Sequence, residues 1–256
     1  MNNKLRSVGE RLSRGIVLNR KLPVEFEGRT MYVSPEAGGL RYWQLNTSKV
    51  DTQLLSIVSN YIKPGFVVWD IGANIGLFTL TAAVKAGRTG KVLSVEADVF
   101  NSYILSKSLK ANPDLNIDLL TCAIANQKGL VQFNIANRAR CSNFINLSKG
   151  NTDSGGVRNY YNVLSLTLDE IIKWYDAPDF IKVDIEGAEK YLLAGAVELF
   201  QMYTPIVYME VEKINAAYIK EFFKSKGYKM FDGENPSIEI FEPVSNTVFI
   251  HFKSQQ

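Results

Sequence analysis

The stretch that decides the fold reads Val67-Val68-Trp69-Asp70-Ile71-Gly72-Ala73-Asn74-Ile75-Gly76-Leu77-Phe78-Thr79. An apolar run ends at an acid, passes two glycines and opens into apolar residues at helical spacing. This order is typical of a central strand of a parallel sheet that turns tightly into a helix. Gly72 can adopt a φ angle that a side chain forbids, and Gly76 allows the helix to lie close to the sheet. The free N–H groups at the start of that helix favour an electron-rich ligand.

The spacing of this turn separates two classes of nucleotide ligand. The motif Gly-x-Gly-x-x-Gly is typical of dinucleotide-binding sites, but Asn74 stands where its second glycine is expected. The chain instead has Asp-x-Gly-x-x-x-Gly, and the carboxylate of Asp70 would repel a pyrophosphate. An acid at this position suits a ligand with an ammonium group and ribose hydroxyls, such as S-adenosylmethionine. A lone glycine motif also occurs in unrelated strand–turn–helix units, so other regions must decide.

Composition and charge narrow the class of protein. The chain has 256 residues, of which 46% are hydrophobic, enough for one large α/β domain with a small extension. Its net charge of +3 is too small to indicate a nucleic-acid partner. The two cysteines, Cys122 and Cys141, form neither a disulfide framework nor a zinc site. No apolar run reaches the roughly 18 residues that span a bilayer, so the sequence predicts a soluble, cytoplasmic protein.

The N-terminal region is basic and differs from the rest of the chain. Residues 1–21 carry six basic side chains and one acidic side chain. Apolar residues at helical spacing predict an amphipathic helix over residues 5–16, which either caps the domain or contacts a membrane surface; capping is the favoured interpretation. Residues 23–48 predict short strands and a loop. We therefore expect an N-terminal extension over residues 1–50 and a Rossmann-like domain over residues 51–256.

Periodicity and turn residues place the other elements. They predict helices over 51–62, 77–85 and 100–109, and strands over 67–71, 91–96, 117–122, 131–135, 144–147, 180–185 and 205–212. The small residues of the turn 122–126, which include Ala123, are expected to line an adenine slot. Residues 148–162 are polar and glycine-rich, and they predict either a plain loop or a lid over a substrate.

Glu96 closes the strand predicted over residues 91–96, and it lies 20 residues beyond Gly76. At this distance a carboxylate can accept hydrogen bonds from both ribose hydroxyls of an adenosine ligand. Proteins that bind S-adenosylmethionine and proteins that bind NAD both use such an acid. Glu96 therefore indicates adenosine without deciding between the two cofactors.

A second cluster of charges lies on the strand that begins at Phe180. Lys182, Asp184 and Glu186 alternate with apolar residues, so they are expected on one side of the strand. Charges in a central strand are costly unless they are paired or used. Either Lys182 and Asp184 form a buried ion pair, or the cluster belongs to a functional site. Glu210 ends the next strand, and the carboxyl ends of parallel strands meet along one crevice.

Four segments carry a resemblance when they are taken together: Asp70–Thr79, Ser165–Glu170, Ile181–Glu189 with Leu193–Ala196, and Pro205–Glu210. In this order, over roughly residues 50–215, they resemble the FkbM family of S-adenosylmethionine-dependent methyltransferases. The resemblance implies a Rossmann-like class I methyltransferase fold, α/β with a central, mostly parallel sheet and helices on both faces. It implies methyl transfer to hydroxyl groups of sugars or polyketide-type natural products. Ala97 departs from the family, which usually has proline after the ribose acid.

These arguments assign roles to particular residues. Cofactor contacts are predicted for Asp70, Gly72, Ala73, Asn74, Gly76, Glu96, Ala97 and Ala123. An alcohol must lose its proton when it is methylated, and Asp184 is the predicted base, with Lys182, Glu186 and Glu210 as further catalytic candidates. Asp184, Glu186 and Glu210 could instead hold Mg²⁺, although nothing in the sequence requires a metal. The segment Asp-Ile-Glu-Gly stands where amino-group and base methyltransferases commonly have Asn/Asp-Pro-Pro-Tyr, which favours an oxygen acceptor.

Two other functions stay open at this point. An NAD-dependent oxidoreductase would share the fold and Glu96, but its glycine fingerprint is missing. A non-catalytic module that binds adenosine or a partner protein would keep the fold with a broken site, and the filled acid positions argue against it. The predicted partner is a small-molecule acceptor.

Overall fold

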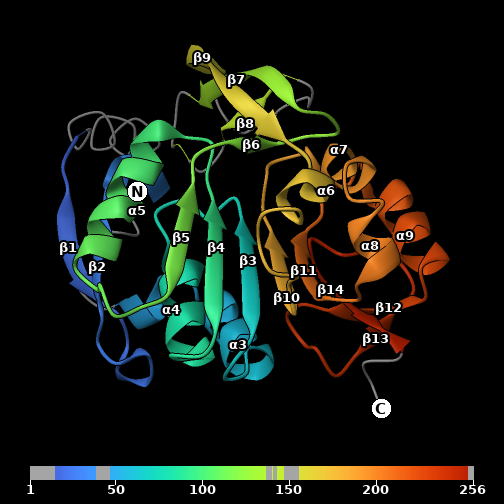
Figure 1. Cartoon of the computed structure of the whole chain (residues 1–256), viewed down its shortest axis with the longest axis horizontal. Helices are drawn as coiled ribbons and strands as arrows, with labels where there is room; N and C mark the ends of the chain where they lie inside the picture. The colour runs from blue at the N-terminus through green and yellow to red at the C-terminus, as the bar shows by residue number, and fades with distance from the viewer. Residues whose placement is uncertain (1–14, 39–46, 137–139, 141–142, 147–155, 253–256) are drawn as a thin grey trace, which may run out of the picture.

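The protein is built around a central eight-stranded sheet, seen in the computed structural model, which describes residues 15–38, 47–136, 140, 143–146 and 156–252 (Figure 1). The strand order is β13-β12-β14-β11-β10-β3-β4-β5. The strands are β3 (Val67–Ile71), β4 (Lys91–Val95), β5 (Ile117–Leu120), β10 (Phe180–Val183), β11 (Ile206–Glu210), β12 (Tyr228–Asp232), β13 (Glu239–Ile240) and β14 (Asn246–His251). The five strands from β11 to β5 pair in parallel, and β14 is antiparallel to both β11 and β12. The expected α/β fold with a mostly parallel sheet is therefore confirmed.

Helices cover both faces of this sheet, because the central strands carry apolar side chains on both of their faces. On one face Val68 and Phe180 pack with α3 (Thr52–Tyr61) and α4 (Leu77–Ala86). On the other face Trp69 packs among four further helices, α6 (Leu168–Ile171), α7 (Glu189–Ala194), α8 (Leu199–Met202) and α9 (Ala216–Ser225). None of the helices in the described part of the chain has the length and hydrophobicity needed to cross a bilayer.

The described N-terminal residues pack against the same core. Strand β1 (Leu18–Lys21) pairs antiparallel with β2 (Thr30–Val33), and the backbone of β2 bonds to Ser108 in α5 (Val99–Lys110). The short strands expected over 23–48 are found only in part. A 3-10 turn, η1 (Val24–Phe26), precedes β2, and a helical turn, α2 (Pro35–Gly38), follows it; another 3-10 turn, η3 (Thr47–Lys49), leads into α3. Nearly all of the predicted helix over 5–16 lies outside the described residues.

A second, four-stranded sheet lies beyond the carboxyl ends of β3, β4 and β5 (Figure 1). Its order is β6-β9-β7-β8, from β6 (Ala123–Ile124), β7 (Gly129–Ala136), β8 (Phe144–Ile145) and β9 (Val157–Leu166). The expected strands over 131–135 and 144–147 correspond to β7 and β8. This small sheet forms a wall above the edge where parallel α/β sheets bind their ligands.

The prediction of a loop or lid over residues 148–162 is wrong for residues 157–162. Residues 157–162 belong to β9, which pairs antiparallel along nearly the whole of β7. Tyr161 accepts a hydrogen bond from the backbone N–H of Val99 through its hydroxyl, so it ties the small sheet to α5. The polar composition arises because one face of β9 is exposed, with Tyr160 outward, while Val163 is buried. Residues 148–155 lie outside the described residues.

Candidate active site

The turn between β3 and α4 is held close to two neighbouring strands. Gly72 (φ +79°), Asn74 (φ +52°) and Gly76 (φ +92°) all lie in the left-handed region. The N–H groups of Gly72 and Ala73 donate to the carbonyl oxygen of Val95, at 2.9 and 3.0 Å. A Cβ on Gly72 would lie 1.9 Å from the carbonyl oxygen of Asp184, so both conformation and space require glycine.

Gly76 has a different neighbour from the one expected. A Cβ at this position would lie 2.3 Å from Cδ1 of Leu105, a residue of α5. Gly76 therefore allows α4 to begin close to α5 rather than close to the sheet. Ala73 and Gly76 do not line the main cavity, although Ala73 lines a smaller neighbouring cavity of about 60 Å³.

Asp70 lies beneath the turn and does not line either cavity. Its buried carboxylate accepts a 2.6 Å hydrogen bond from Thr79 Oγ1 and lies 3.3 Å from Lys182 Nζ. Lys182 Nζ also donates to the carbonyl oxygen of Gly72 at 2.7 Å and lies 3.4 Å from Asp184. Burial alone lowers the pKa of Lys182, but the two carboxylates raise it above its ordinary value, so the ammonium stays charged. Lys182 thus joins the ends of β3 and β10.

Glu96 is buried at the end of β4 and lines the cavity. Its two carboxylate oxygens accept hydrogen bonds from the N–H of Asn74, at 2.7 Å, and from the N–H of Asp98, at 2.8 Å. Burial raises the pKa of Glu96 to about 7, and the two backbone N–H groups partly oppose this shift. Each oxygen keeps acceptor capacity for a ligand hydroxyl.

The cavity has a volume of about 390 Å³ and three walls. The first follows the carboxyl ends of β3 to β5 and includes Gly72, Glu96, Ala97 and Cys122. The second belongs to the small sheet and adds Phe133 and Phe144, which the sequence placed on added strands without assigning them to a site. Ala123 of β6 lies on this second wall as well. Small and aromatic side chains together suit a flat base, and the adenine slot predicted at the turn 122–126 stays a prediction.

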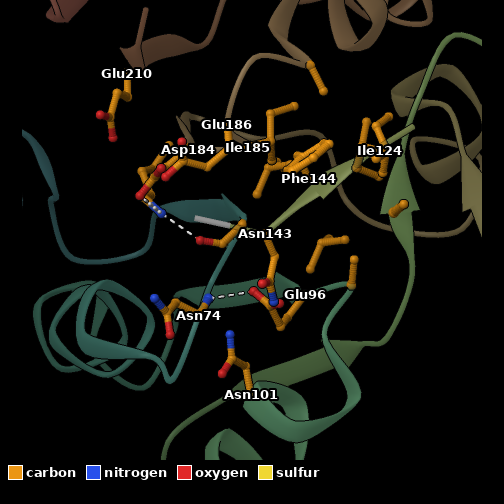
Figure 2. A pocket seen from close by; sticks show the side chains of 18 of the residues that line it. Asn74, Glu96, Asn101, Ile124, Asn143, Phe144, Asp184, Ile185, Glu186 and Glu210 are labelled. Atoms are coloured by element: carbon orange, nitrogen blue, oxygen red, sulfur yellow. Dashed lines mark hydrogen bonds and ion pairs between the residues drawn. The ribbon is translucent and has the colours of Figure 1, made fainter. Parts of the chain in front are cut away.

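The third wall gathers the acids at the ends of β10 and β11. Asp184, Glu186 and Glu210 lie at one end of the cavity, as Figure 2 shows. Burial raises the pKa of Glu186 to about 8, and the Asp184 and Glu212 carboxylates add to this shift. Burial of its carboxylate at the cavity, and then Asp184, raise the pKa of Glu210 above its ordinary value, although the residue as a whole is exposed.

The structure gives this acidic end further neighbours that the sequence did not indicate. Tyr208 lies beside Lys182 on the adjacent strand, and its hydroxyl donates to Asn246 Oδ1 at 3.0 Å. The Asn246 amide in turn donates to Gln53 Oε1 at 3.3 Å. Asn246 belongs to β14, beyond the segments that carried the resemblance, so no sequence signal pointed to it. Among the described residues, no three His, Cys, Asp or Glu side chains are arranged to hold a metal ion, and the geometry lends the magnesium alternative no support.

A buried network of ion pairs holds the small sheet against the start of α5, next to Glu96. Arg140 lies 2.7 Å from Asp98 and 3.0 Å from Glu36, and Arg158 of β9 also pairs with Glu36. Asn143 Nδ2 donates to Asp98 Oδ2 at 2.5 Å. Asp98 is the N-cap of α5, accepting hydrogen bonds from the backbone, and it follows Glu96 by two residues. Arg140 therefore links Glu36 of the N-terminal region to Asp98, which follows Glu96.

The sequence was compared with protein families and with curated proteins. A family model described as "Methyltransferase FkbM domain" matches residues 70–230, more than half of the chain. No curated protein matches the sequence.

Several solved structures are similar to this chain. The FkbM methyltransferase from Methylobacillus flagellatus KT is 18% identical, with a TM-score of 0.49, over 83% of this chain and 57% of that one. The precorrin-6y C5,15-methyltransferase from Geobacter metallireducens GS-15 is 13% identical, with a TM-score of 0.45, over 79% and 86%. M. jannaschii TYW2 in complex with AdoMet is 13% identical, with a TM-score of 0.45, over 88% and 84%.

Proposed function

Since the chain belongs to the FkbM family of S-adenosylmethionine-dependent methyltransferases, we propose that it transfers a methyl group to a hydroxyl oxygen of a small molecule of the sugar or polyketide type. Family membership also removes the NAD-dependent oxidoreductase and the non-catalytic module from consideration as the main function. The nature of the acceptor is the part that we infer from the site.

Several groups in the cavity wall support cofactor binding. Glu96 offers a buried carboxylate to ribose hydroxyls, and the side-chain oxygen of Asn74, also in the cavity wall, is buried with no hydrogen-bond partner among the described residues. Ala97 and Ala123 leave room for the base beside Phe144. When bound, S-adenosylmethionine supplies an electrophilic methyl group on a sulfonium. The predicted cofactor roles of Gly72, Asn74, Glu96, Ala97 and Ala123 are kept as part of this proposal, whereas Asp70, Ala73 and Gly76 act by shaping the turn.

One observation carries the choice of an oxygen acceptor: acids converge at the end of the cavity formed by β10 and β11 (Figure 2). A hydroxyl is a weak nucleophile until a base within hydrogen-bond reach accepts its proton. We assign the base role to Asp184, which Lys182 holds at 3.4 Å while leaving it 39% exposed to the cavity side. Glu186 and Glu210 lie at the same end of the cavity, and because their pKa values are raised they are largely protonated at neutral pH, so they face the acceptor as hydrogen-bond donors rather than as bases.

Most of the remaining rate enhancement must come from positioning. Methyl transfer is an in-line displacement, so the acceptor oxygen has to meet the methyl carbon at near-attack distance. Lys182 fixes both the Gly72 carbonyl on the cofactor side and Asp184 on the acceptor side. A single buried ammonium thus sets the spacing between the two halves of the site.

The decisive experiment screens sugars and polyketides with radiolabelled S-adenosylmethionine, followed by mass spectrometry of the product to locate the methyl group. With an acceptor in hand, Asp184→Asn is expected to lower kcat by roughly 10²–10⁴. Stability should change by less than about 1 kcal/mol, because Asp184 is partly exposed and Lys182 keeps Asp70 and the Gly72 carbonyl.

The matched control is Glu212→Gln, an acid that lies near Glu186 but does not line the cavity. The kcat of this variant should stay close to that of the wild type. Large destabilisation of Asp184→Asn with normal turnover per folded molecule would reduce Asp184 to a structural partner of Lys182. A label found on nitrogen or carbon would overturn the proposed acceptor class.

A further inference from the structure

Asn101 is a buried polar residue that neither the sequence motifs nor the proposed chemistry has used. It lies in the first turn of α5 and lines the cavity, yet its side chain is only 2% exposed. Its carbonyl oxygen, Oδ1, has no hydrogen-bond partner among the described residues. Buried polar atoms are nearly always paired, so an orphaned oxygen in a cavity wall requires a reason.

Further oxygen acceptors lie near Asn101. Asn74 Oδ1 is a second buried oxygen without a partner, and Figure 2 shows Asn74, Glu96 and Asn101 gathered at one end of the cavity. The turn that carries Asn101 is folded onto Glu96, because Ser102 Oγ donates to the Glu96 carbonyl oxygen at 3.2 Å. This end of the cavity therefore suits a ligand that presents several hydrogen-bond donors.

Two donors of the segment between β7 and β8 are already committed. Arg140 is paired with Asp98 and Glu36, and its guanidinium stacks on Phe100 at 4.7 Å. Asn143 Nδ2 donates to Asp98. Among the described residues neither of these two donors is free to pair with Asn101 Oδ1, which leaves this oxygen available to a donor on a bound ligand.

We propose that Asn101 is a cofactor-positioning residue whose side-chain oxygen accepts a hydrogen bond from a ribose hydroxyl of S-adenosylmethionine, beside Glu96. The ribose is the group that matches, because it presents two hydroxyl donors next to the carboxylate that is expected to receive them. The base is accounted for elsewhere: Figure 2 places Ile124 and Phe144 apart from Asn101, on the side of the small sheet. This assignment holds for any acceptor, so it stands independently of the proposed O-methylation.

The test measures binding of S-adenosylhomocysteine to the full chain by calorimetry, with no acceptor present. Asn101→Leu keeps the size of the side chain and removes both polar atoms. It is expected to weaken binding about tenfold, the loss of one hydrogen bond. The melting temperature of the unliganded protein should not fall, because Asn101 Oδ1 makes no hydrogen bond there to lose. Asn101→Ala provides a second variant if leucine prevents folding.

A double-mutant cycle between protein and ligand identifies the contact. The 2′-deoxy and 3′-deoxy analogues of S-adenosylhomocysteine are titrated into wild type and into each variant. If Asn101 binds one hydroxyl, the variant loses affinity for the parent ligand but not for the analogue that lacks this hydroxyl. An equal loss for all three ligands, or no loss for any of them, would overturn the assignment.

The matched control is Asn112, a second buried asparagine just beyond the other end of α5. Its amide donates to the carbonyl oxygens of Thr30 and Ser108, both at 2.7 Å. Asn112→Leu should lower the melting temperature and leave the affinity for S-adenosylhomocysteine unchanged, the reverse of the pattern expected for Asn101→Leu.

Discussion

Lys182 is the residue at which the buried charges and the cavity meet. The sequence left two interpretations of its cluster, a buried ion pair or a site; the structure shows the ion pairs, and the role in the site stays a proposal. Lys182 balances the buried Asp70 and also reaches the cavity wall beside Asp184. The two carboxylates differ in burial, since the Asp70 side chain is fully buried and that of Asp184 is 39% exposed. Removing Asp70 should therefore cost stability, and removing Asp184 should cost chiefly activity.

At the same scale, Glu96 should make cofactor binding depend on pH. Burial raises its pKa from 4.5 to about 7, so the unfolded chain ionises first and the unliganded protein loses stability as pH rises between these values. Ribose hydroxyls bind the ionised carboxylate best. The affinity for S-adenosylhomocysteine should thus increase by up to about tenfold between pH 6 and pH 8, as calorimetry can measure. Glu96→Gln should bind weakly with a flat profile; a variant that keeps the wild-type pH dependence would show that another group titrates.

At the scale of elements, the small sheet is attached to the start of α5 by ion pairs and hydrogen bonds as well as by packing. Arg140 and Asn143 come from the segment between β7 and β8, and both contact Asp98 at the start of α5. Tyr161 of β9 bonds to the next residue of that helix. The position of Glu96, whose carboxylate accepts from the Asp98 N–H, therefore depends on strands that are distant in the sequence.

Disrupting this attachment should be costly. Arg140→Met leaves Asp98 buried without its cation, and the free energy of unfolding should fall by roughly 3–5 kcal/mol. Urea unfolding measures this as a lower midpoint at an unchanged slope. Arg29→Met is the comparison, because Arg29 pairs with Asp114, whose side chain is 50% exposed, and its loss should cost less than about 1 kcal/mol. Equal losses for the two variants would mean that the Arg140 network adds no more than a surface pair.

At the scale of the whole molecule, the cavity lies where the main sheet, the small sheet and the C-terminal strands meet. Ligand binding should therefore stabilise the fold as a unit. At 100 times its Kd, S-adenosylhomocysteine should add about 2.7 kcal/mol and raise the melting temperature by roughly 5–10 °C. NAD at the same concentration should leave the melting temperature unchanged, because Asn74 stands where a dinucleotide turn needs glycine. Equal stabilisation by NAD would contradict the cofactor assignment.

The sequence by itself determined the features that are encoded locally. The strand–turn–helix at residues 67–79 follows from an apolar run, two glycines and helical periodicity, and all three lie within a few residues of one another. The place of Glu96 at the end of β4 follows in the same way, from a strand that closes on an acid. The parallel core was predictable because strands buried on both faces must be apolar throughout.

Only the tertiary structure decided what depends on neighbours distant in the chain. Residues 157–162 are polar enough for a loop, but pairing with β7 satisfies their backbone groups and makes them a strand. The sequence position of Asp70 suggests a ligand contact. In the structure its carboxylate is buried beneath α4, where it bonds to Thr79 and pairs with Lys182, so its role is structural. Asn101 and Asn246 carry no signal of their own, since an asparagine becomes a cavity residue only when several elements fold around it. Hydrogen bonds and charges act on what lies within a few ångströms, and sequence order does not reveal those distances.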